Sequence, residues 1–444
     1  MKKILSVLCV LTVAAALFTG CSKKEGSAKK GPVTINLWSF TDEIPGMVDK
    51  YIADHPDCGF TVNTTIIATT EGAYQPALDQ ALMAGGADAP DMYAAEAAFI
   101  LKYSQGDMQS YAMPYKDLGI DIDAKIKAAE IAPYTVDIGS NTSGQVDALG
   151  YQTTGGCFIY RRSIAKKVFG TDDPKEINAV IGGGSNSWAK FEDAAAKLAA
   201  AGVAIVSGDG DIWHAYENSS DKGWIVDGKL YIDPKREAFI DASKKLTDNG
   251  WSNQTQDWTD AWFADMKDAG AKPCFGFFGP AWLINYVLAG NSGDTYGDWA
   301  VCNSPIGFFW GGTWVLANKS LPAAKKDAVR TLIEWITLDY SNDGLLYKWA
   351  NGTLNGEGGT KDTVSSGAVM AKSNGTLEFL GGQNMFDYFV PANKYANGKN
   401  LTQYDETINS LWREQVRAYA NGQKSRADAI KDFKQNVADK LGVE

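Results

Sequence analysis

Residues 33–40 read VTINLWSF, and the fold follows from this stretch and what comes after it. Its alternation of apolar and polar residues, rich in β-branched side chains, predicts a strand. Apolar residues at helical spacing follow over 47–52 and stop before a proline, because the residue preceding proline is pushed out of the helical region. A second strand is predicted over 60–68, a helical stripe over 74–82 and a third strand over 90–94. This alternation predicts an α/β lobe on a parallel sheet.

The same alternation restarts in the second half of the chain. A capped helix over 187–198 leads into a strand over 203–207, and a helix over 233–250 is followed by a strand over 273–278. A further helix is predicted over 322–337, with two more in the C-terminal stretch. A chain of 444 residues exceeds the roughly 250–300 residues that one core organises, so we expect two α/β lobes.

Composition excludes several classes of function. Lys and Arg number 42 and Asp and Glu 53, which gives a net charge of −11 without the stripe of basic residues that neutralising phosphates demands. We therefore expect no nucleic-acid partner. His55 and His214 are the only histidines, which disfavours His-ligated zinc and a Ser-His-Asp relay. The 14 Trp, 19 Tyr and 18 Phe favour aromatic stacking surfaces.

The N-terminal segment is predicted to be a targeting signal. Two lysines precede a mainly apolar run of 15 residues (4–18), which is too short for a permanent span, so residues 1–20 match a signal peptide. The run LFTGC is similar to a bacterial lipobox, which would place a lipid on Cys21. Residues 21–31 are then a lipid-anchored flexible tether, polar and rich in Gly, Ser and Lys. We expect a protein anchored to the membrane and no second membrane segment.

The remaining cysteines carry no metal-site spacing. Cys58, Cys157, Cys274 and Cys302 are far apart in sequence, so a zinc site is not expected. Cys274 and Cys302 could pair outside the cell, where disulfides persist. Alternatively, all four are buried thiols that behave as small hydrophobic side chains.

At this point the sequence resembles the extracellular solute-binding proteins, carbohydrate type (family 1), that feed ATP-binding cassette importers. The resemblance is carried by a series of segments in the family's order. They are INLWSF (35–40), PDMYAAE (90–96), ALGYQTTGGCFIYRR (148–162), SWAKFEDAAAKL (187–198), FFGPAW (277–282) and GGTWVLANKS (311–320). One departure lies just before the first crossing between lobes, where Gly150 replaces the family's usual proline.

The resemblance implies an architecture and partners. The expected fold is the two-lobed periplasmic-binding-protein-like fold (type II), with a mainly parallel sheet flanked by helices in each lobe and a hinge between them. The first lobe is expected over 32–151 plus 306–345 and the second over 152–305 plus 346–444. The expected partners are a carbohydrate ligand, the permease subunits of the transporter and the membrane, through the lipid on Cys21. A monomer on the extracytoplasmic face of the cell membrane is expected, with no cofactor.

Sugar binding requires flat aromatic platforms and hydrogen-bonding carboxylates or amides. In open α/β sheets such groups collect at strand ends and helix starts. Glu96, at the end of the third predicted strand, is the preferred carboxylate, and Trp310 and Trp314 flank two glycines that would let a ligand approach the backbone. The candidate ligand-binding residues are Trp38, Phe40, Glu43, Glu96, Gln152, Trp213, Trp258, Phe278, Trp282, Trp310 and Trp314.

Each candidate has a structural alternative. Any single tryptophan could pack in the core, and Trp335 and Trp412 are assigned there because they fall on apolar helical stripes. Glu96 could cap a helix, and His214 is interpreted as a structural histidine. The GDGD run at 208–211 lacks the further acids of a calcium loop, so no metal site is expected.

Two other functions use similar residues. A lipid-anchored extracellular glycoside hydrolase would need two carboxyl groups about 5 to 10 Å apart around one bond, and no motif in the sequence singles out such a pair. A surface glycan-binding adhesin would bind sugar without a transporter. Solute binding is preferred, so no catalytic residue is expected and the protein is predicted not to be an enzyme.

Overall fold

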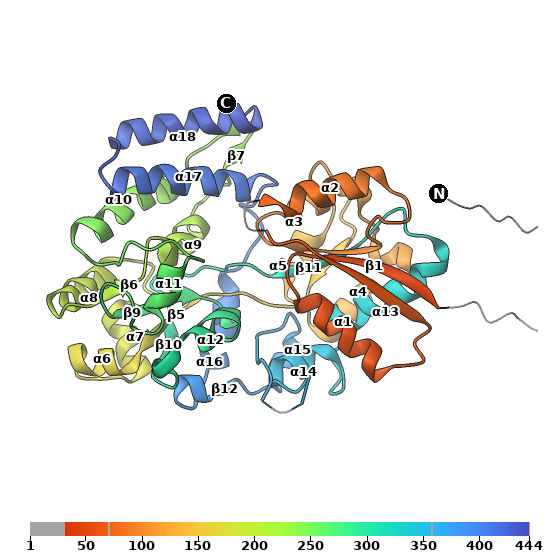
Figure 1. Cartoon of the computed structure of the whole chain (residues 1–444), viewed down its shortest axis with the longest axis horizontal. Helices are drawn as coiled ribbons and strands as arrows, with labels where there is room; N and C mark the ends of the chain where they lie inside the picture. The colour runs from red at the N-terminus through yellow and green to blue at the C-terminus, as the bar shows by residue number, and fades with distance from the viewer. Residues whose placement is uncertain (1–31, 70–71, 357, 444) are drawn as a thin grey trace, which may run out of the picture. The chain divides into compact units, whose positions relative to one another are not determined.

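The computed structural model describes residues 32–69, 72–356 and 358–443. The predicted signal peptide (1–20), Cys21 and the tether (21–31) lie outside the described residues. Residues 33–444 form one unit that contains a five-stranded and a four-stranded sheet, each flanked by helices (Figure 1). This confirms the predicted α/β fold with two lobes.

The first lobe is built on the five-stranded sheet, in the order β2-β1-β3-β11-β4. Its strands are β1 (Val33–Ser39), β2 (Phe60–Ile66), β3 (Met92–Glu96), β4 (Ala148–Gly150) and β11 (Thr313–Ala317). Its helices are α1 (Glu43–Asp54), α2 (Tyr74–Ala84), α3 (Ile100–Ser104), α4 (Ile122–Ala129), α5 (Pro133–Gly139), α13 (Lys326–Thr337), α14 (Leu345–Asn351) and α15 (Gly367–Met370). Short 3₁₀ turns are η2 (Gln109–Tyr111), η3 (Tyr115–Leu118) and η6 (Ala323–Lys325).

Successive side chains of a strand point to opposite faces of the sheet, and helices cover both faces of this one. Leu37 and Ala94 pack in one core with residues of α1 and α13. Tyr93 and Trp314 pack in a second core with residues of α2 and α3. In Figure 1, α1 lies on one side of β1 and β11 and α2 and α3 on the other. Burial on both faces explains why β3 and β11 are nearly continuously apolar.

The second lobe is built on the four-stranded sheet, in the order β10-β5-β9-β6. Its strands are β5 (Cys157–Arg161), β6 (Ala204–Val206), β9 (Cys274–Gly279) and β10 (Trp299–Asn303), with hairpins β7 (Ile225–Val226) to β8 (Lys229–Leu230) and β12 (Thr376–Leu377) to β13 (Gln383–Asn384). Its helices are α6 (Arg162–Phe169), α7 (Pro174–Ile181), α8 (Ala189–Ala200), α9 (Gly210–Asn218), α10 (Pro234–Asp248), α11 (Asp260–Asp265), α12 (Ala289–Asn291), α16 (Phe386–Ala392), α17 (Asp405–Ala420) and α18 (Arg426–Leu441). The π-helix η4 (Leu283–Leu288) and the 3₁₀ turns η5 (Gly293–Thr295), η7 (Glu378–Leu380) and η8 (Asn393–Tyr395) complete it.

The direction of strand pairing corrects one expectation. The sheets were expected to be mainly parallel, but β11 runs antiparallel to β3 and β4, and β5 runs antiparallel to β9 and β10. The parallel pairs are β1 with β2, β1 with β3, and β6 with β9. The reason is that β4 leads the chain out of the first lobe and β11 brings it back, so these two neighbours run in opposite directions. The same holds for β5 and β10 in the second lobe.

Three chain segments lie side by side where the lobes meet. Thr154 accepts a backbone hydrogen bond from Trp310 N (3.1 Å), and Gly156 N donates to Phe308 O (2.8 Å). On the other side, Ser365 N donates to Tyr151 O (2.8 Å). We call residues 151–156, 304–312 and 362–366 the crossing ribbon. Helices α14 and α15, which precede and follow its third segment, pack with α13 and α4 of the first lobe.

The cysteines of the described residues are free thiols: Cys58, Cys157, Cys274 and Cys302. Cys274 and Cys302 lie on β9 and β10, which are separated by β5. Cys157, Cys274 and Cys302 are buried and Cys58 is half-buried, so the structure favours the buried-thiol alternative over a disulfide for all but Cys58, which is only partly buried. No helix among the described residues has the length and apolar character that a membrane crossing needs.

Candidate functional site

Three tryptophans meet beside the crossing ribbon, and we call Trp258, Trp282 and Trp310 the indole cluster. The rings of Trp258 and Trp282 are nearly parallel, with centroids 6.2 Å apart and an interplanar angle of 9°. Trp310 meets Trp282 edge-on at 4.8 Å and Trp258 at 6.2 Å. Trp282 and Trp310 are half-buried and Trp258 is 44% exposed. The cluster therefore presents aromatic surface to solvent, as a stacking platform requires.

Local backbone geometry places two of these rings. Trp282 directly precedes the π-helix η4, and such wide turns occur often at functional sites. Its Nε1–H donates to the carbonyl oxygen of Trp310 (3.1 Å), which fixes one indole against the segment that carries the other. Gly311 and Gly312 follow with φ of 72° and 111°, values that side chains disfavour. The prediction that these glycines mark a close approach agrees with this geometry.

Glu96 lies at the end of β3, beside the indole cluster. Its Oε2 accepts a hydrogen bond from Ala98 N (2.8 Å), so it does cap the following turn. A Cβ placed on Gly311 would lie 3.4 Å from both Glu96 Oε1 and Trp282 Nε1, so the carboxyl group and the indole both border the space above this glycine. Burial raises the pKa of Glu96 to about 7, with smaller contributions from the charges of Glu406 and Glu217. A half-buried carboxyl group with a free oxygen is suited to accept hydrogen bonds from ligand hydroxyls.

His214, interpreted from the sequence as a structural histidine, lies against the indole cluster. Its ring stacks on Trp310 at 4.6 Å, and its Nδ1 lies 2.8 Å from Glu217 Oε2. Burial alone would raise the pKa of Glu217, but the hydrogen bond and charge of His214 outweigh it and lower that pKa. The signal that pointed to His214 was its position next to Trp213, but Trp213 itself lies in the core.

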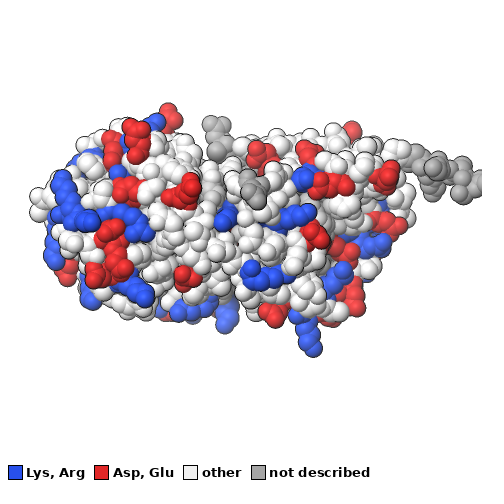
Figure 2. Space-filling model, turned by 90° about the horizontal axis from the view of Figure 1, so that it is seen from below, with Lys and Arg blue, Asp and Glu red and all other residues white. Residues whose placement is uncertain are grey.

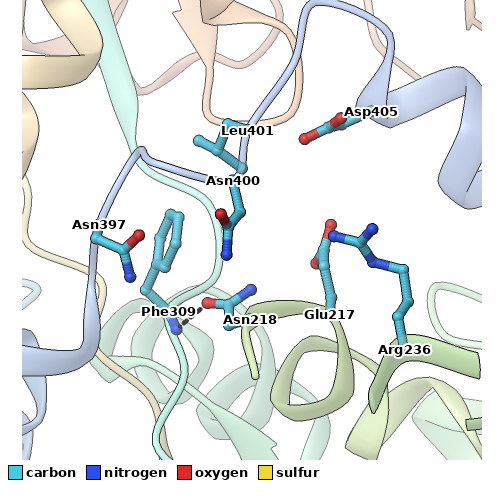
Figure 3. A pocket seen from close by; sticks show the side chains of 8 residues that line it. All are labelled: Glu217, Asn218, Arg236, Phe309, Asn397, Asn400, Leu401 and Asp405. Atoms are coloured by element: carbon cyan, nitrogen blue, oxygen red, sulfur yellow. Dashed lines mark hydrogen bonds between the residues drawn. The ribbon is translucent and has the colours of Figure 1, made fainter. Parts of the chain in front are cut away.

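Glu217 also lines a small cavity beyond His214 (Figure 3). The cavity measures about 10 Å³, close to the space that one water molecule needs. Its lining residues are Glu217, Asn218, Arg236, Phe309, Asn397, Asn400, Leu401 and Asp405. Asn218 Oδ1 accepts a hydrogen bond from Phe309 N (2.7 Å), drawn as a dashed line in Figure 3. None of the predicted ligand-binding residues lies there, and the cavity is too small for a sugar ring.

Two other predicted residues, Glu43 and Gln152, lie at the crossing ribbon. Tyr151 donates its hydroxyl hydrogen to Glu43 Oε2 (2.5 Å), and Gln152 Nε2 donates to Asp362 Oδ2 (2.9 Å). Burial raises the pKa of Glu43 to about 7 and that of Asp362 to about 8, and the charge of Glu43 adds to the shift of Asp362. Partial burial raises the pKa of the exposed Tyr286, and the charges of Asp42 and Glu43 add to that shift.

This buried carboxyl pair predicts that stability falls as pH rises. Both groups bind protons more tightly in the folded than in the unfolded chain, so the free energy of unfolding decreases between about pH 4 and pH 8. Asp362→Asn removes one charge and keeps an acceptor for Gln152. We expect it to flatten the decline and to raise the free energy of unfolding at pH 8 by about 1–2 kcal/mol.

The measurement is urea denaturation from pH 5 to pH 8.5. The matched control is Asp193→Asn, which removes an exposed carboxyl group on α8. An unchanged slope in Asp362→Asn would contradict the proposed origin of the pH dependence.

The remaining predicted residues do not join the indole cluster. Trp38 and Phe40 are half-buried and pack on the second core of the first lobe, where the Phe40 ring meets Tyr74 edge-on at 5.8 Å. Trp213, Phe278 and Trp314 are between 0% and 1% exposed, so their rings lie inside the lobes. The sequence spacing could not separate these buried rings from the exposed ones.

The surface and the metal-ligating groups add two observations. On the face in Figure 2, Lys and Arg side chains intermingle with Asp and Glu. In the part of the chain that the structure describes, no group of three or more His, Cys, Asp or Glu side chains is placed to hold a metal ion.

Comparisons with known proteins identify the family and support the fold. A family model described as "Bacterial extracellular solute-binding protein" matches residues 46–354, more than half of the chain. A solved extracellular solute-binding protein of family 1 superimposes with a TM-score of 0.71 at 18% identity, over 92% of this chain and 99% of that one. No curated protein sequence matches.

Two further solved structures carry sugars. The ABC transporter associated binding protein from B. animalis subsp. lactis Bl-04, in complex with β-1,6-galactobiose, has a TM-score of 0.67 at 19% identity and covers 92% of this chain and 97% of its own. The galacto-N-biose/lacto-N-biose I-binding protein of the ABC transporter from Bifidobacterium longum, in complex with lacto-N-biose, has a TM-score of 0.67 at 17% identity, over 93% and 98%. At these identities the likeness shows the fold.

Proposed function

Because the chain belongs to the family of bacterial extracellular solute-binding proteins, we propose that it captures a sugar or oligosaccharide between its lobes and delivers it to the permease of an ATP-binding cassette importer. The family also gives an extracytoplasmic location. The lipid anchor on Cys21, the permease partner and the monomeric state are parts of the proposal.

The observation that carries the proposal is the meeting of the indole cluster with Glu96. Glu96 comes from the first lobe, Trp258 and Trp282 come from the second, and Trp310 comes from the crossing ribbon. A pyranose has an apolar face that stacks on indole and an edge of hydroxyls that hydrogen-bond to carboxylates. The sugars bound by structural relatives, from a monosaccharide to disaccharides, support a carbohydrate ligand.

The proposed mechanism is closure of the two lobes about the crossing ribbon. A sugar that touches Glu96 and Trp282 together contacts both lobes in the closed state and only one in the open state. It therefore stabilises the closed state by its differential affinity. Since α14 and α15 pack on the first lobe, we propose that the chain makes its last crossing after Met370, in place of the boundary expected at residue 345.

A thermal-shift screen tests the proposal. β-1,6-Galactobiose, lacto-N-biose and maltose are the first probes, and a sugar that binds only the folded protein raises the melting temperature. We expect at least one sugar of a wider carbohydrate panel to do so, small-angle scattering to show a smaller radius of gyration in its presence, and chromatography to recover it intact. A sugar that is cleaved would favour a glycoside hydrolase. Binding without compaction would contradict closure.

A further inference from the structure

The turn that carries Trp258 has an unusual backbone. Thr259 donates from its backbone N (3.3 Å) and its Oγ1 (2.6 Å) to the carbonyl oxygen of Gln256, which closes a tight turn over 256–259. Trp258 is its third residue and has a φ of +67°, a left-handed conformation that normally selects glycine there. A bulky residue in this conformation persists only when its surroundings impose it, and such strain gathers at functional sites.

Packing of the Trp258 ring alone gives weak restraint. The ring contacts Trp262 at 5.6 Å between centroids and lies at the edge of the indole cluster, yet the residue remains 44% exposed. The turn is also restrained by a contact outside this ring.

A further contact comes from Arg413 on helix α17, 156 residues along the chain from Asp257. Arg413 Nη1 donates to Asp257 Oδ2 (3.0 Å), and Nη2 donates to Asp257 Oδ1. Two parallel N–H···O bonds fix the orientation of a carboxylate as well as its position. A Cβ on Gly210 would lie 2.4 Å from Asp257 Oδ1 and 2.6 Å from Arg413 Nη2, so the pair passes directly over this glycine. We call Asp257 and Arg413 the Arg–Asp clamp.

The charges around the clamp keep it ionised. Burial alone would raise the pKa of Asp257, but the charge and hydrogen bonds of Arg413 outweigh it and lower that pKa. Asp209 adds a further carboxyl group near Arg413, and His214 contributes near Asp257. The clamp thus lies behind the indole cluster and adjoins the residue that stacks on Trp310.

We propose that Arg413 is a positioning residue: through Asp257 it holds the turn 256–259 in its left-handed form and so presents Trp258 as the third wall of the indole cluster. The expected effect on sugar affinity rests on the proposed sugar-binding function. The expected position of the Trp258 ring rests on the Arg–Asp clamp alone. Without the clamp the turn relaxes to an unstrained conformation and the Trp258 ring leaves Trp282 and Trp310.

The first test needs no ligand. Near-ultraviolet circular dichroism reports the coupling of stacked indoles, and we expect Arg413→Ala to give the same difference spectrum as Trp258→Phe. Asp257→Asn, which keeps the shape of the side chain, is the second variant in case Arg413→Ala does not fold. The matched control is Arg426→Ala, which breaks another two-bond Arg–Asp pair, with Asp241, in the same lobe. A wild-type spectrum in both clamp variants would overturn the proposal.

The second test is a double-mutant cycle on sugar affinity, with β-1,6-galactobiose, lacto-N-biose and maltose as probes. If Arg413 acts through Trp258, then Arg413→Ala and Trp258→Ala each weaken binding about tenfold, and the double variant is no weaker than either alone. Arg413→Lys, with one point charge in place of the planar fork, recovers part of the loss. Additive losses, or an unchanged affinity in Arg413→Ala, overturn the proposal. If none of the probes binds the wild type and the spectra still change as expected, the choice of sugar fails and the clamp stands.

Discussion

Trp282→Ala is expected to weaken sugar binding by about 30- to 150-fold, equivalent to about 2–3 kcal/mol. This indole meets Trp310 edge-on, lies nearly parallel to Trp258 and approaches Glu96 over Gly311. Its loss removes a stacking surface and also the donor that fixes Trp310 O. Isothermal titration calorimetry with the most stabilising sugar of the thermal-shift panel measures the effect on folded protein.

The control for this variant is Tyr296→Ala, which removes another aromatic side chain that is 54% exposed in the second lobe and packs on Phe379. We expect its affinity to equal that of the wild type. Equal losses in both variants, or none in Trp282→Ala, would place the binding site elsewhere.

Trp314→Ala is expected to lower the free energy of unfolding by about 3–5 kcal/mol, the usual cost of removing a buried aromatic side chain. Trp314 is 0% exposed, donates Nε1–H to Thr135 O (2.8 Å) and meets Tyr134 edge-on at 6.4 Å. The deletion leaves a cavity and a buried carbonyl oxygen without its donor. Denaturation by urea without sugar measures the loss.

Trp314→Phe separates the two causes, because it keeps most of the ring and loses the donor. We expect a smaller loss of about 1–2 kcal/mol. A folded Trp314→Ala protein with wild-type stability and no sugar binding would restore the original expectation that this ring is a ligand platform.

The sequence predicted the order of elements well. The strand predicted over 33–40 is Val33–Ser39, and the one over 273–278 is Cys274–Gly279. These predictions succeeded because periodicity and chain-breaking residues act locally. Whether neighbouring strands run parallel or antiparallel was harder to predict, because it depends on which strands lie next to the crossings between the lobes.

The site was only partly predictable, for the same physical reason. Trp258, Trp282 and Trp314 look alike in sequence, since each lies near a strand or a helix start. Exposure separates them: Trp314 points into a lobe and Trp258 points out of one. The Arg–Asp clamp joins residues 156 positions apart, and no local pattern encodes such a contact.

The crossing ribbon has a consequence for kinetics. Segments 151–156 and 304–312 carry the chain between the lobes and are hydrogen-bonded to each other, so we expect the two lobes to open along a restricted path. The association rate of a small solute is set by diffusion, whereas its dissociation requires the lobes to open along that path. Substitutions in residues 151–156 or 362–366 should therefore alter residence time while leaving the choice among sugars unchanged.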